Sequence, residues 1–487
     1  MIKNIAESIL SFGMDFNVEE IHKTSIKILD EIGIYIGSNN GLNLLDSIGC
    51  RVDYKSKNVK IPPSIIDKAL SCSSPFRKFY DRSGNKLISI GGNNIVSCTS
   101  AAHIRVREYE GTYRKPNLDD LVNMTKIHDY FENVDIMSNI VDPVDIPLKT
   151  YQTQIAAILL KNTTKPCDFI VNNPVEAEYI YKMGCAIRGS KKNLIEKPLF
   201  SIGASSEAVL GYMDKECDLL IRCAELRIPT GGGSYPIIGL TAPLSISGAL
   251  ALANANFLAT HVIKTSIDPK SSTIYPVSAA LFDMKSSNIV TSSPEIWLYY
   301  LMGTKLGKYY NLPIYTIVST DSKKSDLQMA YEKAMGYFIC ACAGANIISS
   351  ATCALDAFNL ASYEQIIIDS EIISSISYYF NKFKINSSSN DFEMIKDSLN
   401  SKLYFLDSDY TLKNYKKDIW DYNVFIKDSF LNWEKIGMPS VIDNAHEKVN
   451  KILKDYKVPE LPSDVLKEMD NIVAGALNRE GVDSKDI

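Results

Sequence analysis

Hydroxyl, amide and tyrosine side chains follow the β-strands that the sequence predicts, and few fully charged side chains stand among them. A tyrosine ring attracts a weakly hydrated cation over its face, at about 0.5–2 kcal/mol per contact. No predicted strand end carries a lysine for a Schiff base, a His/His/Asp set for a metal or a Ser/His/Asp arrangement. The pattern therefore predicts a site that binds a cationic ligand without a metal. The predicted ligand-binding residues are Tyr235, Tyr275, Phe282, Asn172, Ser319, Thr320, Asp321 and Ser349.

Each of these residues also has a structural interpretation that involves no ligand. Tyr235 and Tyr275 each precede a proline, and such pairs in loops commonly serve local packing. Asp321 could cap the helix that follows it, Ser349 could bond to backbone, and Asn172 could simply end a strand. The sequence leaves both interpretations open, with Asp321 as the best candidate for a catalytic residue.

Strand-like runs alternate with helical patterns from residue 95 onwards, and these elements must position the site. Eight such repeats over roughly 285 residues are typical of a (β/α)₈ barrel, whose sites lie at the C-terminal ends of the strands. A doubly wound sheet is the alternative, but no GxGxxG turn follows the first strand. The predicted strands are residues 95–98, 135–141, 167–171, 199–203, 230–233, 273–277, 314–318 and 346–348.

The sequence predicts an α/β protein of three parts. An N-terminal extension of helices and short strands occupies residues 1–94, and the TIM barrel occupies 95–385. A polar linker then leads into a C-terminal helical appendage, 386–487, which carries no recognisable chemistry.

Composition narrows the class of protein. A net charge of −5 lacks the basic footprint of a nucleic-acid-binding protein. The ten cysteines contain no CxxC pair, which favours free thiols in a reducing cytoplasm. The start of the chain lacks the features of an export signal, and no apolar run approaches the roughly 18 to 20 residues of a membrane span. We therefore expect a soluble, cytoplasmic protein.

Several segments resemble the trimethylamine methyltransferase family, in order and in spacing, over nearly the whole chain. The resemblance implies a (β/α)₈ methyltransferase that passes a methyl group from a methylamine to the cobalt of a separate small corrinoid protein. It implies no tightly bound cofactor, since the partner presents the corrinoid. The segments include Asn162 to Pro166, Gly239 to Leu244, Ser293 to Glu295, Thr320 to Lys323, and Ile368 to Glu371.

The founding members of that family carry pyrrolysine, which this sequence lacks. The chain therefore resembles the non-pyrrolysine branch, which implies a quaternary amine such as glycine betaine as methyl donor. A quaternary ammonium leaves as a neutral amine, so positioning accounts for most of the catalysis. We expect a homo-oligomer with this activity. The alternatives are a catalytically lapsed barrel that only binds a methylamine or betaine, and an enzyme of the same fold that uses a tertiary amine as methyl donor.

One segment departs from the family pattern. Ser349 and Ser350 stand where many non-pyrrolysine relatives have a His-Asp pair. The loss of an imidazole from a position expected to face the ligand leaves the identity of the donor open.

Overall fold

The computed structural model describes residues 17–99, 102–206, 210–350, 352–382, 391–401 and 404–481. Its centre is a barrel of eight parallel strands, so the predicted TIM barrel is confirmed. The barrel strands are β6 (Val96–Ser97), β9 (Met137–Ser138), β10 (Cys167–Ile170), β11 (Phe200–Gly203), β13 (Thr230–Gly231), β15 (Tyr275–Val277), β18 (Ile314–Ile317) and β19 (Ile347–Ser349).

The strands pair in two arcs of four. One arc runs in the order β13-β11-β10-β9 and the other in the order β15-β18-β19-β6. A parallel bridge between Cys98 and Ile136 joins β6 to β9. Between β13 and β15, the buried side chains of Arg77 and Lys264 both donate hydrogen bonds to the carbonyls of Thr230 and Ser272. Side chains therefore hold this seam of the barrel together.

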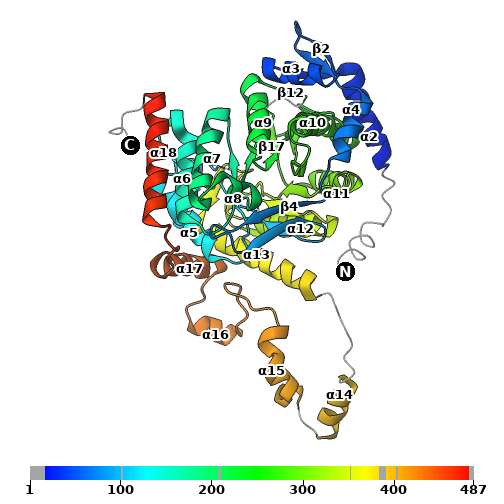
Figure 1. The fold of residues 1–487 in the computed structure, drawn as a ribbon. Helices are drawn as coiled ribbons and strands as arrows, with labels where there is room; N and C mark the ends of the chain where they lie inside the picture. Colours follow the sequence, from blue (N-terminus) through cyan, green and yellow to red (C-terminus); the bar gives the residue numbers. More distant parts are fainter. Residues whose placement is uncertain are drawn as a thin grey trace.

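A ring of helices surrounds the strands in chain order (Figure 1). Local signals fix their ends. Asn173 caps α7 and Gly189 ends it in the left-handed conformation, while Asp326 and Gly344 do the same for α12. The ring consists of α5 (Leu118–Tyr130), α6 (Tyr151–Asn162), α7 (Pro174–Arg188), α9 (Asp214–Leu226), α10 (Ile246–Ile267), α11 (Pro294–Tyr309), α12 (Leu327–Ala343) and α13 (Tyr363–Lys382).

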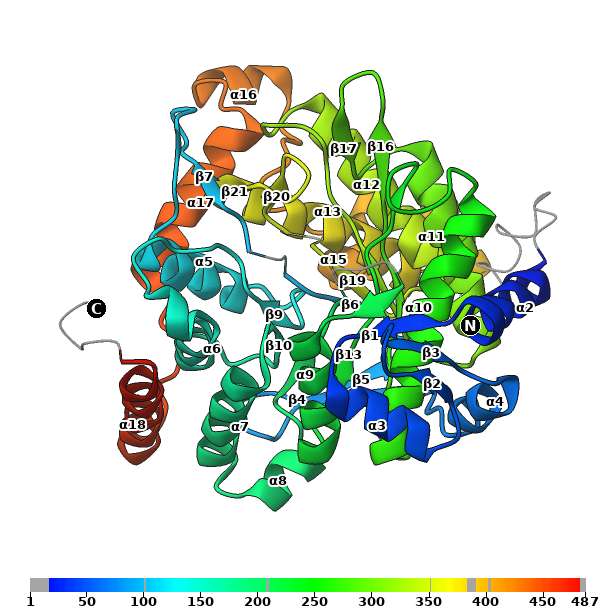
Figure 2. The same ribbon diagram turned by 90° about the horizontal axis from the view of Figure 1, so that it is seen from above.

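The antiparallel hairpin of β4 (Phe76–Tyr80) and β5 (Leu87–Gly91) closes the N-terminal end of the barrel, which we call the floor. Its side chains Phe79, Ile88 and Ile90 form a buried cluster with the barrel residues Val96, Cys98, Ile136, Ile274 and Ile347. In Figure 2 the hairpin lies at the opposite end of the barrel from β16 (Ala280–Asp283) and β17 (Asn288–Val290).

Two small sheets follow the C-terminal ends of the barrel strands, at the end that we call the mouth. One has the order β14-β16-β17 and the other β20-β21-β7-β8. Their remaining strands are β14 (Ile237–Ile238), β7 (Arg105–Arg107), β8 (Tyr113–Arg114), β20 (Ala354–Leu355) and β21 (Leu360–Ser362).

The described part of the N-terminal extension packs on α9 and α10. Its sheet has the order β12-β1-β3-β2, so β12, from the segment between β11 and α9, joins it. Its elements are α2 (Val18–Lys27), η1 (Ile28–Ile32), β1 (Ile34–Ile36), α3 (Asn39–Ser47), β2 (Arg51–Asp53), β3 (Asn58–Lys60) and α4 (Pro63–Ser71), with β12 at Gly211–Tyr212.

The C-terminal helices fall into two groups. Helix α17 (Val441–Asp455) packs against α5 and α13, and α18 (Ser463–Glu480) packs against α6 and α7. The described residues between 391 and 438, which we call the arm, extend below the barrel in the view of Figure 1. The arm contains α14 (Asp391–Asn400), η3 (Phe405–Asp407), α15 (Asp409–Asp418) and α16 (Phe430–Lys435). Its exposed apolar side chains include Phe392, Leu399, Tyr404, Leu406, Leu412, Tyr415, Phe430 and Leu431.

Helix α10 corrects one expectation from the sequence. Its 22 residues are long and apolar enough to cross a membrane, although no such stretch was expected. Most of the apolar window is buried, because α10 packs against α2, α4, α9 and α11. It is therefore a core helix of a soluble protein.

A buried polar network connects α12, α13 and the segment after β19. Lys333 pairs with Asp369 at 2.6 Å, and both side chains are almost fully buried. Gln365 Nε2 and the backbone N–H of Cys353 donate to the same carboxylate at 2.7 and 2.8 Å. We call these four residues the helix network. All of these bonds lie within the protein, as buried charges require.

Candidate functional site

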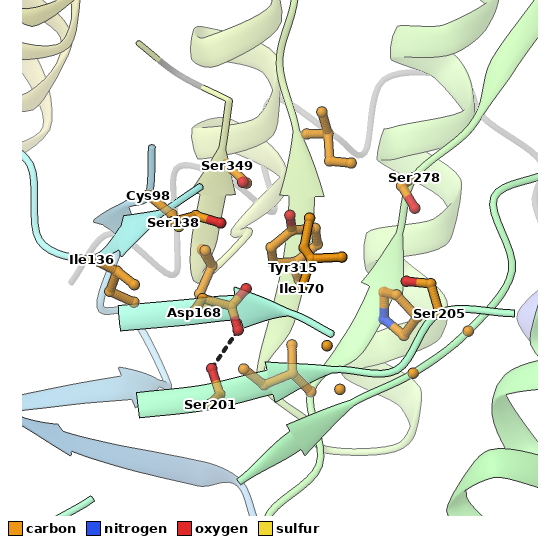
Figure 3. A pocket seen from close by; sticks show the side chains of 18 of the residues that line it. Cys98, Ile136, Ser138, Asp168, Ile170, Ser201, Ser205, Ser278, Tyr315 and Ser349 are labelled. Carbon is orange, nitrogen blue, oxygen red and sulfur yellow. Dashed lines mark hydrogen bonds between the residues drawn. The ribbon is translucent and has the colours of Figure 1, made fainter. Parts of the chain in front are cut away.

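A cavity of about 210 Å³ lies inside the barrel, between the floor and the mouth. Inward-facing residues of the barrel strands form its walls, and Arg77 and Phe79 of β4 contribute from the floor. Serine, isoleucine and glycine make up most of the wall, with a few aromatic rings among them, as Figure 3 shows for part of it. Its polar wall residues include Ser138, Asp168, Ser201, Ser205, Ser234, Tyr235, Ser278, Tyr315 and Ser349.

Three buried hydroxyl groups near the mouth have no hydrogen-bond partner within the described residues. They belong to Ser234, Tyr235 and Ser319. Ser234 and Tyr235 line the cavity, and Ser319 lies on the same side of its chain segment as the lining residues Tyr315 and Ile317. Burial raises the pKa of Tyr235, and so does the nearby Asp321, so its phenol stays protonated. A buried polar group without a partner is costly unless a ligand or water satisfies it.

Asp168 places a carboxylate in the wall between floor and mouth. It lies on β10, is lined up with Ser201 of β11 in the parallel pairing, and accepts a hydrogen bond from the Ser201 hydroxyl (Figure 3). Burial raises the pKa of Asp168, while the bond from Ser201 and the charge of Arg77 lower it. The cavity therefore holds an acidic group whose charge depends on its local partners.

Arg77 contributes a guanidinium at the floor. Its Nη2 donates to the carbonyls of Thr230 and Ser272 at 2.9 and 2.7 Å, and its Nε donates to the Ser272 hydroxyl at 3.3 Å. Burial lowers the pKa of Arg77 to about 10, and Asp168 opposes that shift. Arg77 therefore remains a cation at neutral pH.

Tyr235 and Ser349 are the two predicted residues that line the cavity. The Ser349 hydroxyl donates to the Thr99 carbonyl at 3.2 Å. Tyr275 has a different position, because its hydroxyl donates to Asn254 of α10 at 3.0 Å and its ring packs edge-on against Phe257. The structure therefore does not bring the two predicted tyrosines together around one space.

Asp321 holds the segment before α11. Its carboxylate accepts bonds from the N–H and the hydroxyl of Thr291 and from the N–H of Ser292. Burial raises the pKa of Asp321. The capping role open in the sequence belongs instead to Asp326, which accepts from the N–H of Met329. Neither the cavity wall nor the cap of α12 includes Asp321.

The other predicted residues lie outside the cavity wall. Thr320 donates to Glu332 of α12 at 2.5 Å. Asn172 is exposed to solvent, and Phe282 lies on β16, in the small sheet at the mouth. Their positions follow the structural interpretation of the sequence more closely than the ligand-binding one.

The polar residues that face the cavity from mid-strand escaped the sequence analysis, which considered only strand ends. Asp168 lies within the predicted strand segment from Cys167 to Ile170. Arg77 lies between Phe76 and Lys78 in a segment outside the predicted barrel. A carboxylate in the middle of an apolar barrel strand is a usable signal, since side chains alternate between the two faces of a strand. Arg77 had no comparable signal, because the hairpin meets the barrel only in three dimensions.

Residues 7–479 match the profile of the family described as trimethylamine methyltransferase (MTTB). This chain belongs to that family. Its relatives include the trimethylamine methyltransferase MttB of Desulfitobacterium hafniense, which is 26% identical over 97% of this chain and 96% of its own length. A glycine betaine methyltransferase of the same species is 26% identical over 94% of this chain and 95% of its own.

The fold resembles a solved structure as well. The monomethylamine methyltransferase MtmB of Methanosarcina barkeri matches 98% of this chain and 92% of its own, with a TM-score of 0.53 and 11% identity. At that identity the likeness concerns the fold alone. Family membership makes the chain a corrinoid-dependent methyltransferase, and enzymes of this family work with corrinoid proteins.

Proposed function

We propose that this enzyme transfers a methyl group from a quaternary amine of the betaine type to the Co(I) of a corrinoid on a small partner protein. The observation that carries the proposal is the composition of the cavity wall. It combines aromatic rings, small hydroxyl residues and a carboxylate, Asp168, with Arg77 at the floor, in a space of about 210 Å³. The rings and the carboxylate suit the ammonium group of a small organic donor.

The chemistry of the donor supports this choice. Methyl transfer from a quaternary ammonium breaks one C–N bond and releases a neutral tertiary amine, so no proton has to be supplied. The residues then act by holding the methyl group in line with the acceptor. The three unpaired hydroxyls, of which one is the protonated phenol of Tyr235, provide dipoles for this purpose and no strong acid.

The proposed binding residues are Tyr235, Ser319 and Ser349. The ring of Tyr235 would contact the ammonium group, and the two hydroxyls would orient the rest of the molecule. Tyr275 and Asp321 are not included, because their polar groups are engaged away from the cavity wall.

A direct assay tests the proposed function. The purified enzyme is mixed with cob(I)alamin and with glycine betaine, carnitine or trimethylamine, and methylcobalamin is followed by its absorbance. We expect methyl transfer from one or more of the two quaternary donors and little from trimethylamine. Faster transfer from trimethylamine would contradict the proposal and favour a tertiary amine, and binding of a betaine without any transfer would favour a lapsed barrel.

We further propose that the corrinoid protein docks at the mouth and that the enzyme is a cytoplasmic homo-oligomer. The hairpin β4–β5 fills the floor, which leaves the mouth for the partner. The exposed apolar residues of the arm support contact with a second copy of the chain, since a monomer rarely exposes so much apolar surface in one place. Light scattering on the purified enzyme tests the oligomer, and a monomer at micromolar concentration would contradict it.

A further inference from the structure

Two opposite charges face the same cavity without contacting one another. Arg77 and Asp168 both line it, yet no nitrogen of Arg77 lies within 4.0 Å of the Asp168 carboxylate. They interact only through space, as their mutual effect on pKa indicates. The Arg77 side chain is buried and that of Asp168 is half-buried, and a charge withdrawn from water needs a partner to offset its desolvation.

Each of the two groups keeps one unused bonding atom. Among the described residues, Arg77 bonds through Nε and Nη2 and leaves Nη1 without a partner. Asp168 bonds to Ser201 through Oδ1 and leaves Oδ2 without one. Figure 3 shows the second oxygen of Asp168 pointing away from Ser201. A free donor and a free acceptor of opposite charge therefore border one space.

We propose that Arg77 and Asp168 together select a zwitterion, with the carboxylate of the donor on Arg77 and its quaternary ammonium beside Asp168. This inference rests on the proposed function and narrows its donor to an ammonium that carries a carboxylate. Such a ligand satisfies both groups at once. A simple cation leaves the buried guanidinium of Arg77 without a counter-charge, and a simple anion leaves the carboxylate of Asp168 without one.

The neighbouring lysine does not change this balance of charge. Lys264 Nζ donates to the Thr230 carbonyl and contacts Thr273 Oγ1 at 3.3 Å, and Lys264 is absent from the cavity wall. Burial lowers the pKa of Lys264 well below its ordinary value, and the charge of Arg77 lowers it further. The two charged groups that line the cavity therefore sum to zero, which matches a donor of zero net charge.

The positions of Arg77 and Asp168 also determine how the bound methyl donor is oriented in the cavity. Arg77 comes from the floor hairpin, and Asp168 lies on a barrel strand above it. A carboxylate held at the floor leaves the ammonium group on the side of the mouth, where Tyr235 lies. The N-methyl groups then face the end of the barrel that is left open to the methyl acceptor.

Calorimetry with three probes of similar size tests the inference. Glycine betaine carries both charges, choline lacks the carboxylate, and 3,3-dimethylbutanoate replaces the ammonium nitrogen by carbon. We expect the enzyme to bind glycine betaine at least about tenfold more tightly than either of the other two, because a site built for a charged group rejects an analogue that lacks it. Equal binding of glycine betaine and choline by the unmodified enzyme would overturn the proposal.

Two substitutions test which charged group of the donor each residue binds. Arg77→Gln should weaken glycine betaine binding by about tenfold or more and change choline binding less than about threefold, while Asp168→Asn should weaken both. The matched control is Arg82→Gln, since Arg82 also bonds to backbone carbonyls but does not line the cavity. If Arg77→Gln does not fold, Arg77→Lys keeps a charge at the seam, and betaine binding should still fall while choline binding does not.

The outcomes separate this inference from the proposed function. Binding does not require methyl transfer, so an enzyme that binds glycine betaine through Arg77 but demethylates neither glycine betaine nor carnitine would overturn the function and leave the inference standing. If glycine betaine is demethylated and Arg77→Gln does not affect that reaction, the inference is overturned and the proposed function stands.

Discussion

The helix network and the polar groups of the cavity are both buried, yet they differ in how far the protein satisfies them. Lys333, Asp369 and Gln365 bond to one another across α12 and α13. At the cavity, the hydroxyls of the lining residues Ser234 and Tyr235 and of the nearby Ser319 have no partner in the described chain. A satisfied network contributes to folding, whereas unsatisfied groups that surround a space are kept at a cost to stability. The difference separates residues that hold the fold from residues that await a ligand.

The largest expected effect is the loss of an ion-pair partner in the helix network. Lys333→Met leaves the Asp369 carboxylate buried without a counter-charge, so the free energy of unfolding should fall by about 3–5 kcal/mol. Urea denaturation measures it. Lys23→Met is the control, because the pair of Lys23 with Glu19 is exposed. A decrease in the free energy of unfolding of less than about 1 kcal/mol would show that Lys333 does not stabilise the fold through Asp369.

Acid should destabilise the region around the helix network through His128. Burial lowers the pKa of His128 from 6.5 to about 3, and its Nε2 contacts Thr352 Oγ1 at 2.9 Å. The unfolded chain therefore binds a proton at higher pH than the folded one. Stability is complete above pH 6.5 and falls as the pH drops towards about 3, by up to about 1.4 kcal/mol per pH unit for this group.

Urea denaturation at several pH values measures that slope. His261 adds to it, because burial lowers the pKa of His261 to about 4. His128→Gln should therefore reduce the slope without removing it. An unchanged slope in that variant would show that His128 does not titrate between its folded and unfolded values.

The smallest effect separates two buried tyrosines. The hydroxyl of Tyr337 bonds to Ser97 Oγ at 2.8 Å, whereas that of Tyr235 has no partner. Tyr337→Phe should lower the free energy of unfolding by about 1 kcal/mol, and Tyr235→Phe should leave it unchanged or raise it. Thermal denaturation compares the two, and an equal loss in both would remove the contrast between network and cavity.

The barrel was predictable because its signal is local. Each strand–helix repeat shows its own period, as in the apolar run at 314–318 and the capped helix from Leu327. The family resemblance added the enzyme class. The N- and C-terminal boundaries proposed from the sequence remain predictions.

The site was only partly predictable, because a shift of one residue along a strand changes the face on which a side chain lies. Ile274, just before β15, and Pro276 of β15 line the cavity, so Tyr275 between them points to the helices. The position of a strand end in the sequence does not reveal which of its side chains face the inside of the barrel. Tyr235 and Ser349 were found because each lies where its strand reaches the mouth, whereas Arg77 reaches the cavity through a hairpin distant in sequence.

The closed floor of the barrel restricts how molecules can reach the cavity. Phe79, Ile88 and Ile90 fill the floor, so under the proposed docking the donor and the acceptor would both reach the cavity from the mouth. A corrinoid protein seated there would shut the donor in and keep the spent amine from leaving. On the proposed docking at the mouth, the amine would have to enter first and the partner second, and the partner would have to depart before the next cycle could begin.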